Sequence, residues 1–423
     1  MRKLSLFLVV MLLSILLVVS FTLSVSAEEP VTLIFSSWRT EDIDAMNRVN
    51  AIFMEKHPDI VVDFQPIKNT EYDGQLASSL QAGVGPDIMY LRSYDGARIL
   101  YNSGFLYELN DAIPVLKGFP EAAKAAWSTE EGIIYGVPSV GVTHGIFYNK
   151  EIFDKYGLKE PTTWAEFIDV CDTLKDKGER VLAAGLKDQW QLYEVLYSGL
   201  GANFYGGEKN RQKLIAGEMK MTDKPFVKAF EKMKELQPYY PKGATGIGYV
   251  DMQMLFTTGQ AAIYYGGSWE IGVFESMKPD FEIGWFPPPV ENKGDTIQYC
   301  FHVDAAVGMN KATKHPKETL EYMKWVTTPE YAQALMNELP GFFSYTPGNY
   351  TLDNPLAKEN IDVAANADIT VRTTWEKLSA QEPSGNILMW EAMFGLLTDK
   401  YTPEEAAAHV QEGLEEWYKP FTK

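Results

Sequence analysis

Cysteine and histidine are scarce in this chain of 423 residues, which has two cysteines and five histidines. The two cysteines, Cys171 and Cys300, exclude a disulfide framework and leave a single long-range bridge as an open alternative. No two histidines have the close spacing of a metal-binding motif, and the sequence contains no HExxH segment. We therefore predict neither a metal site nor a cofactor from the sequence.

Catalytic motifs are also missing. The sequence has no phosphate-binding GxxxxGK[ST] loop. The segment Gly266-Gly267-Ser268-Trp269-Glu270 departs from a nucleophile elbow, because glutamate stands where the final glycine belongs. A glycosidase would need two carboxylates facing each other in a cleft, and none of the 57 acidic residues is singled out as half of such a pair. The residues thus predict no enzymatic activity.

Positive charge is in deficit, since 38 Lys and Arg residues stand against 57 Asp and Glu residues, for a formal net charge of −19. Such a surface repels DNA, RNA and anionic lipid headgroups, so we expect no nucleic-acid partner. Aromatic residues, in contrast, are plentiful, with 10 Trp, 23 Tyr and 22 Phe. This number leaves a surplus beyond the core for a ligand site.

A long apolar run occurs at the N-terminus. Arg2 and Lys3 precede residues 4–23, which are interrupted only by Ser and Thr, and the small residues Ser26 and Ala27 follow. The pattern is typical of a secretory signal peptide over 1–27, with a retained membrane anchor as the alternative. Because no cysteine lies near the cut, we expect an exported protein, periplasmic or extracellular, that is not lipid-anchored.

The first part of the remaining chain alternates strands with helices. Helical spacing of apolar residues begins at Ile43, and a capping-box pattern begins at Thr70. Strands are predicted at 31–36, 60–64 and 88–91. This order predicts an α/β fold with a parallel sheet and right-handed crossovers. Ligands bind such sheets beyond the carboxyl ends of the strands, where loops 36–40 and 92–95 follow.

A chain of this length is expected to divide into two domains. In its later part the sequence predicts several places where the chain crosses from one domain to the other. Strand-like runs at 133–137 and 142–148 flank Pro138-Ser139, and further crossings are predicted at 295–304 and 341–347. Helices are predicted to begin at the capping box of Thr163 and at Thr402, which precedes a proline.

The segment from Ala261 to Gly272 is the most informative. An apolar run, 261–265, reads as a strand that stops at Gly266-Gly267, directly before Ser268 and Trp269. A tryptophan presented on a glycine turn offers a flat apolar face with a polar edge, which suits the C–H face and hydroxyl rim of a sugar. A core tryptophan at a strand-to-helix turn is the alternative.

Seven short motifs follow one another in a characteristic order over nearly all of the chain behind the predicted signal peptide. With them, the sequence resembles the extracellular solute-binding proteins of ABC sugar importers, the family that includes maltose-binding protein. The motifs are Ser37-Trp38, Gly83-x-Gly85-Pro86-Asp87-Ile88, Gly104-Phe105-Leu106-x-x-Leu109, Gly136-Val137-Pro138, Tyr148-Asn149-Lys150-x-x-Phe153, Gly259-Gln260-Ala261-Ala262 and Gly267-Ser268-Trp269.

The resemblance implies a two-lobe periplasmic-binding-protein fold, in which each lobe is a mixed sheet flanked by helices and the ligand cleft lies between the lobes. The N-terminal lobe is then expected at 28–140 plus 303–340, and the C-terminal lobe at 141–302 plus 341–423. The implied function is capture of a sugar, an oligosaccharide in our interpretation, for an ABC transporter permease by a monomeric protein that is not an enzyme.

The resemblance also implies a set of ligand-binding residues. In the N-terminal lobe these are Trp38, Arg39, Asp42, Ser93, Tyr94 and Asp95. At the crossover it is His144, for which a packed strand histidine is the alternative. In the C-terminal lobe they are Trp190, Gly267, Ser268, Trp269, Tyr345 and Trp390. An acidic sugar would need cationic partners, for which Arg39, Arg92 and Arg98 are candidates.

Two alternative functions stay open at this point. One is a secreted carbohydrate-active enzyme. The other keeps the fold but binds ferric iron, because relatives bind it through adjacent tyrosines, and this chain has Tyr239-Tyr240 and Tyr264-Tyr265.

Overall fold

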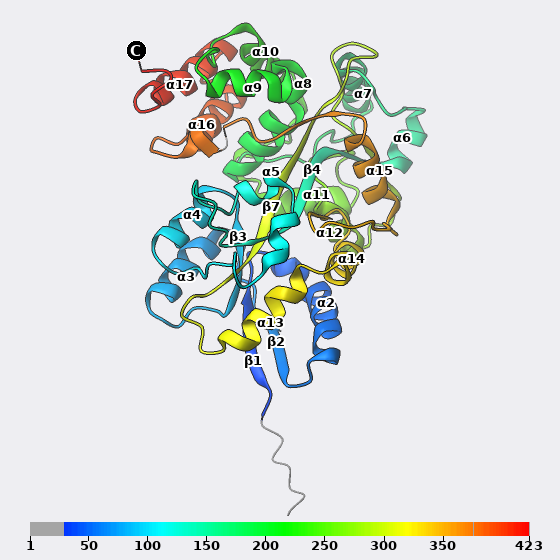
Figure 1. Ribbon diagram of the computed structural model, residues 1–423. Helices are drawn as coiled ribbons and strands as arrows, with labels where there is room; N and C mark the ends of the chain where they lie inside the picture. The colour runs from blue at the N-terminus through cyan, green and yellow to red at the C-terminus, as the bar shows by residue number, and fades with distance from the viewer. Residues whose placement is uncertain (1–28, 375, 423) are drawn as a thin grey trace, which may run out of the picture.

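The computed structural model describes residues 29–374 and 376–422, and the predicted signal peptide, 1–27, lies outside these residues. Figure 1 shows two lobes, one carrying β1 to β3 and the other carrying α6 to α10 with the C-terminal helices. The strands β4 and β7 run between them. Within the described part of the chain, no helix has the length and apolar character needed to cross a membrane.

The sheet of the first lobe is parallel at its start, as predicted. Strand β1 (Val31–Ser36) lies between β2 (Ile60–Phe64) and β3 (Ile88–Arg92), with α2 (Ile43–Lys56) and α3 (Asn69–Gln81) as the connections. The three predicted strands are therefore confirmed. The prediction of a capping box at Thr70 was wrong. Helix α3 already begins at Asn69, and the N-cap residue, Lys68, makes no side-chain hydrogen bond to the helix end.

Two long strands are shared by both lobes. Strand β7 (Gln298–Met309) pairs antiparallel with β3 at one end, and β4 (Val137–Asn149) pairs antiparallel with β7. The prediction of two strands flanking Pro138 was wrong, because the chain continues through it as one strand. The register shifts between Pro138 and Val140, and such an irregularity accommodates a residue without a backbone N–H.

The second lobe extends β4 into a further sheet. Strands β5 (Ile263–Gly267) and β6 (Ile283–Phe286) both pair antiparallel with β4. Strand β5 includes Gly266 and Gly267, so the strand predicted over 261–265 ends later than expected. Helix α7 (Trp164–Asp176) begins at the Thr163 capping box and α17 (Pro403–Glu415) at the Thr402 capping box, which confirms both predicted helix starts.

The segment η3 (Gln191–Leu200) is a π-helix, a wide helical turn that is often found at functional sites. The short strands are β8 (Phe343–Ser344) and β9 (Asp368–Thr370), which pair with β4 and β7 respectively. The remaining α-helices are α4 (Asp95–Asn102), α5 (Glu121–Ala125), α6 (Lys150–Tyr156), α8 (Ala202–Tyr205), α9 (Gly207–Ile215), α10 (Lys224–Lys234), α11 (Tyr249–Thr257), α12 (Glu270–Met277), α13 (Pro316–Val326), α14 (Pro329–Glu338), α15 (Pro355–Ala364) and α16 (Gly385–Leu397).

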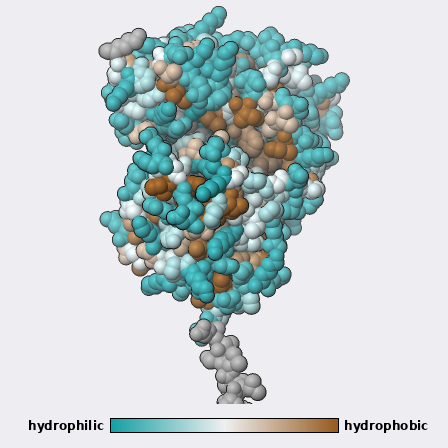
Figure 2. Space-filling model, in the orientation of Figure 1, coloured by the Kyte–Doolittle hydropathy of each residue, from teal (hydrophilic) through white to brown (hydrophobic). Residues whose placement is uncertain are grey.

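The apolar core fills the space between sheets and helices, and the face shown in Figure 2 is mainly hydrophilic, with hydrophobic residues in separate groups. Cys171 and Cys300 are both buried, and neither forms a disulfide, so the single bridge left open by the sequence is excluded. Cys171 lies on α7 and Cys300 on β7.

Candidate functional site

A cavity of about 460 Å³ opens between the two lobes. Its size is that of a small-molecule site. Both lobes supply its walls, together with Asp304 on the shared strand β7. The first lobe contributes Trp38, Arg39, Glu41, Asn69, Thr70, Asp73, Arg92 and Gly96. The second lobe contributes Lys187, Asp188, Gln189, Trp190, Tyr193, Glu194, Tyr249, Trp269, Arg372 and Asn386.

Aromatic rings form a continuous wall on the second lobe. The ring centroids of Trp269 and Trp190 lie 5.9 Å apart, and those of Trp190 and Tyr249 lie 5.0 Å apart. Trp38 lies in the cavity wall of the first lobe. Rings of this kind offer flat apolar surfaces with a polar edge, so the cavity can hold a ligand that is apolar on its faces and polar at its rim.

Gly267 explains how Trp269 is seated at the end of β5. A Cβ atom at position 267 would lie 1.9 Å from the Trp269 ring, far inside van der Waals contact. Only glycine therefore lets the indole fold back over the strand. Ser268 fixes the same turn, since its Oγ accepts a bond from the Thr143 backbone N–H at 3.1 Å and donates to the Gly341 carbonyl.

Glu270 holds the polar edge of Trp269. The indole Nε1 donates to Glu270 Oε1 at 3.1 Å, and the Tyr264 hydroxyl donates to the same oxygen at 2.6 Å. Gln253 Nε2 donates to the other carboxylate oxygen at 2.8 Å. Burial raises the pKa of Glu270 to about 7, although the hydrogen bonds from Tyr264 and Gln253 oppose the shift. The orientation of Trp269 thus rests on a buried carboxyl group.

The arginines of the first lobe already have carboxylate partners. Arg39 makes a two-pronged pair with Asp42, at 2.5 and 2.9 Å. Arg92 Nε donates to Asp73 at 2.9 Å, and its guanidinium lies 4.5 Å from the Trp38 ring centroid. Arg98, the third candidate partner for an acidic sugar, lies 3.4 Å from Asp95. The cavity wall formed by this lobe therefore presents paired charges.

A second charged group lies at the base of the cavity. Arg372 is bound to Glu194 of η3 at 2.5 Å, and it lies 3.6 Å from Asp304 of β7. Burial raises the pKa of Asp304, and the nearby Arg372 opposes that shift. This group connects the π-helix of the second lobe with the strand that both lobes share.

Four of the predicted site residues line the cavity, namely Trp38, Arg39, Trp190 and Trp269. Asp42 is buried behind the first lobe's wall, where it holds Arg39. Gly267 and Ser268 support Trp269 from behind. Ser93, Tyr94 and Asp95 do not line the cavity. Their loop lies beside it, because the flanking residues Arg92 and Gly96 do line the cavity.

The three remaining predicted residues lie outside the cavity lining. His144 is fully buried, with its ring centroid 5.5 Å from that of Trp269. Tyr345 stacks on Phe301 with centroids 6.3 Å apart. Trp390 lies on α16, one turn beyond Asn386, which does line the cavity.

The four tyrosines considered for ferric iron have separate partners. The hydroxyls of Tyr240 and Tyr265 bond to each other, Tyr264 donates to Glu270 and Tyr239 donates to Asp172. None of the four lines the cavity between the lobes. Tyr240 and Tyr265 thus meet each other away from the cavity, and the four hydroxyls do not converge on one point as ligands of a single ion would.

Sequence reasoning missed several residues of the cavity wall. Asn69, Thr70 and Asp73 follow the carboxyl end of β2, so the rule that located the loops after β1 and β3 could have located them too. Glu194 and Arg372 carry no motif and are brought together only by the packing of η3 against the segment after β9.

Comparison with known proteins agrees with this architecture. Residues 36–333 match the sequence model of the bacterial extracellular solute-binding proteins. The chain belongs to this family. One relative, the multiple sugar-binding protein of Streptococcus mutans, is 25% identical over 320 residues, which are 73% of this chain and 74% of that protein. The maltodextrin-binding protein MdxE of Bacillus subtilis is 24% identical over 94% of this chain and 91% of its own length.

Solved structures of similar fold include a chitin oligosaccharide binding protein, with a TM-score of 0.76 and 22% identity over 92% of this chain and 100% of that one. RafE in complex with raffinose gives a TM-score of 0.73 and 24% identity, over 91% of this chain and 99% of that one. These likenesses establish the two-lobe α/β fold of the solute-binding proteins.

Proposed function

We propose that this solute-binding protein captures a sugar, in our interpretation an oligosaccharide, in the cavity between its lobes and delivers it unchanged to an ABC transporter permease. The observation that carries the proposal is the aromatic wall of Trp190, Tyr249 and Trp269 facing Trp38 and Arg39 across that cavity. The named ligands of the relatives, multiple sugars and maltodextrin, support the same class of ligand.

Binding needs no chemical step in this account. The indole faces contact the C–H faces of the sugar, while carboxylates and arginines at the rim bond to its hydroxyls. A site built for hydroxyl groups rejects ligands that lack them, because its own polar groups would be left buried and unpaired. A ligand that contacts both lobes favours the closed form through its higher affinity for that form.

We further propose that the sugar is neutral. Arg39, Arg92 and Arg372 are each paired with a carboxylate within the protein. A negatively charged sugar would have to compete with Asp42, Asp73 and Glu194 for these arginines. A neutral sugar accepts from the arginines and donates to the carboxylates while leaving the pairs in place.

The remaining parts of the proposal concern the whole protein. The lobes are taken as 28–140 plus 303–340 and 141–302 plus 341–423, with β4, β7 and residues 341–347 as the crossings. The protein acts as an exported monomer, and the surfaces of both lobes dock on the permease.

Titration with a panel of neutral and uronic-acid oligosaccharides, followed by tryptophan fluorescence, tests the proposal. We expect at least one neutral oligosaccharide to bind and its uronic-acid counterpart to bind at least about tenfold more weakly, which corresponds to about 1.4 kcal/mol. The same samples are then analysed for new reducing ends. A folded protein that binds none of the sugars, or one that cleaves them, would contradict the proposal.

A further inference from the structure

Asp304 differs from the other carboxylates that line the cavity between the lobes. Those others each have a close protein partner: Glu41 with Arg39 at 3.2 Å, Asp73 with Arg92 at 2.9 Å, Asp188 with the Tyr249 backbone N–H at 2.6 Å, and Glu194 with Arg372 at 2.5 Å. Asp304, in contrast, accepts no hydrogen bond from the described residues, and its Oδ1 lies 3.6 Å from Arg372 Nη2. We infer that Asp304 accepts hydrogen bonds from two adjacent hydroxyls on one ring of the bound sugar, an inference that rests on the proposed function.

The Asp304 side chain is largely removed from water but still faces the cavity. Its exposed fraction is 18%, and it forms part of the cavity wall. Burial raises the pKa of this carboxyl, which reflects the cost of holding its charge there. An ionised carboxylate can accept about four hydrogen bonds on its two oxygens, and leaving them unmade away from water costs free energy. Ligand hydroxyls on adjacent carbons would supply donors to both oxygens.

Arg372 lies beside Asp304 but is held by other acceptors. Its Nη2 donates to Glu194 Oε1 at 2.5 Å, and its Nε donates to His302 Nε2 at 3.4 Å. The 3.6 Å between Nη2 and Asp304 exceeds the ordinary length of an N–H···O bond. The guanidinium therefore stays next to the carboxylate and leaves its oxygens open to the ligand.

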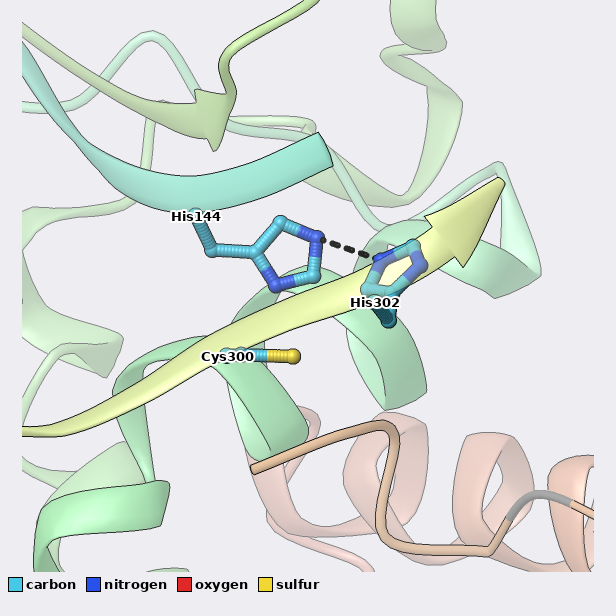
Figure 3. Close-up of side chains that lie close together, drawn as sticks. All are labelled: His144, Cys300 and His302. Atoms are coloured by element: carbon cyan, nitrogen blue, oxygen red, sulfur yellow. Dashed lines mark hydrogen bonds between the residues drawn. The ribbon is translucent and has the colours of Figure 1, made fainter. Parts of the chain in front are cut away.

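A buried histidine pair supports this arginine from behind the cavity. Figure 3 shows the rings of His144 on β4 and His302 on β7 facing each other, with their Nε2 atoms 3.4 Å apart. His302 Nδ1 lies 3.1 Å from the Val303 carbonyl oxygen, which can only accept, so the ring proton belongs on Nδ1. Nε2 then presents its lone pair to Arg372. Burial lowers the pKa of both histidines, which favours this neutral form.

The same histidines connect Asp304 with the aromatic wall. Asp304 is two residues beyond His302 on β7, so both side chains point to the same side of the strand. The ring centroid of His144 lies 5.1 Å from that of His302 and 5.5 Å from that of Trp269. Trp269 and Asp304 both line the cavity. One sugar ring can therefore stack on the indole while its hydroxyl edge faces the carboxylate.

Arg372 also favours hydroxyls over an ammonium group as the ligand of Asp304. An ammonium bonded to the carboxylate would be brought close to the guanidinium 3.6 Å away, and like charges at short range repel. Arg39 and Arg92 act in the same direction as Arg372, since all three oppose the rise in the pKa of Asp304 and so favour its ionised form. A hydroxyl bonds strongly to an ionised carboxylate and brings no charge of its own.

Deoxy analogues of a bound sugar test the inference. A neutral oligosaccharide that binds the mature wild-type protein is found by titration, and calorimetry then measures the affinities of this parent sugar and of its single-deoxy analogues. We expect Asp304→Asn to bind the parent at least about tenfold more weakly, as the loss of hydrogen bonds to a charged acceptor implies. Two analogues, deoxygenated at adjacent positions of one ring, should bind the wild type more weakly than the parent. In Asp304→Asn both should bind about as well as the parent, because their missing hydroxyls have lost their acceptor.

Asp280→Asn is the matched control. It makes the same change of charge at an exposed position of the second lobe outside the cavity lining, and it should leave the affinities for all of these sugars unchanged. Should Asp304→Asn fail to fold, a crystal structure of the wild type with the parent sugar decides. The inference then requires a ligand hydroxyl within about 3.0 Å of each Asp304 carboxylate oxygen.

Unchanged affinity in a folded Asp304→Asn would overturn the inference, as would deoxy analogues that lose the same affinity in both proteins. An amino sugar whose binding alone depends on Asp304 would also overturn it, because the carboxylate would then serve an ammonium group. A wild type that binds the parent sugar separates these failures from a failure of the proposed function. A wild type that binds no sugar contradicts both.

Discussion

The indole Nε1 of Trp269 donates a hydrogen bond of 3.1 Å to the carboxylate of Glu270, the next residue in the chain. Glu270 is fully buried and also accepts from Tyr264 and Gln253. An aromatic ring that lines the cavity is thereby attached to a polar network inside the second lobe. Buried groups behind the cavity wall therefore fix the orientation of Trp269, and the first two predictions follow from this.

Replacing Glu270 by glutamine should weaken sugar binding. The amide keeps one acceptor oxygen but directs an N–H₂ group at donors that now lack a partner, so Trp269 loses its fixed orientation. A hydrogen bond to a charged group is worth about 1.5–3 kcal/mol, and we expect a loss of affinity of that order. Calorimetric titration measures it. Glu275→Gln, an exposed position on the same helix α12, is the control and should leave affinity unchanged.

Stability should fall with rising pH through the titration of Glu270. Its pKa is raised from 4.5 to about 7 in the folded protein, so between these values the folded state binds more protons than the unfolded chain. The free energy of unfolding then decreases by up to about 1.4 kcal/mol per pH unit. Urea unfolding of the wild type and of Glu270→Gln between pH 4.5 and 7 isolates this effect. Parallel pH profiles for the two proteins would show that Glu270 does not titrate in this range.

Substitutions of Trp269 and Trp390 should affect ligand affinity differently, although the sequence predicts both residues to bind ligand. Trp269→Ala should cost about 1–3 kcal/mol of binding free energy, by analogy with the removal of an aromatic ring that stacks on a nucleic-acid base. Trp390 lies outside the cavity lining, so Trp390→Phe should change affinity less than threefold or so. Equal losses in the two variants would place Trp390 at the ligand.

Gly267→Ala should weaken binding without removing any contacting group. The added methyl carbon would lie 1.9 Å from the Trp269 ring, so the indole must leave its place. We expect an affinity loss similar to that of Trp269→Ala. Gly246→Ala is the matched control, because a Cβ there meets no atom within 4 Å. An unchanged affinity for Gly267→Ala would mean that the position of the indole does not matter for binding.

Local signals in the sequence predicted much of the fold. The strands at 31–36, 60–64 and 88–91 and the helix starts at Thr163 and Thr402 depend on apolar periodicity and on capping within a few residues, and they are confirmed. The continuous β4 was missed because a proline normally interrupts a strand, and only its pairing with β7 shows that the chain passes through it.

Apart from Trp190, the predicted residues that line the cavity are those that follow a strand. Trp38, Arg39 and Trp269 stand directly after strand ends, and the structure places them in the cavity wall. Glu194 and Arg372 are 178 positions apart, and His144 and His302 are 158 positions apart. No sequence spacing can predict such neighbours, since only the packing of η3 and the pairing of β4 with β7 bring them together.

A crystal structure of the protein with a neutral oligosaccharide that binds it in titration would show directly whether the cavity between the lobes holds the sugar. We predict a sugar ring lying on the face of Trp269, inside the cavity and in contact with both lobes, with the Arg39–Asp42 and Arg92–Asp73 pairs intact. A sugar bound elsewhere on the chain, or one held in the cavity by arginines that have left their carboxylates, would contradict it.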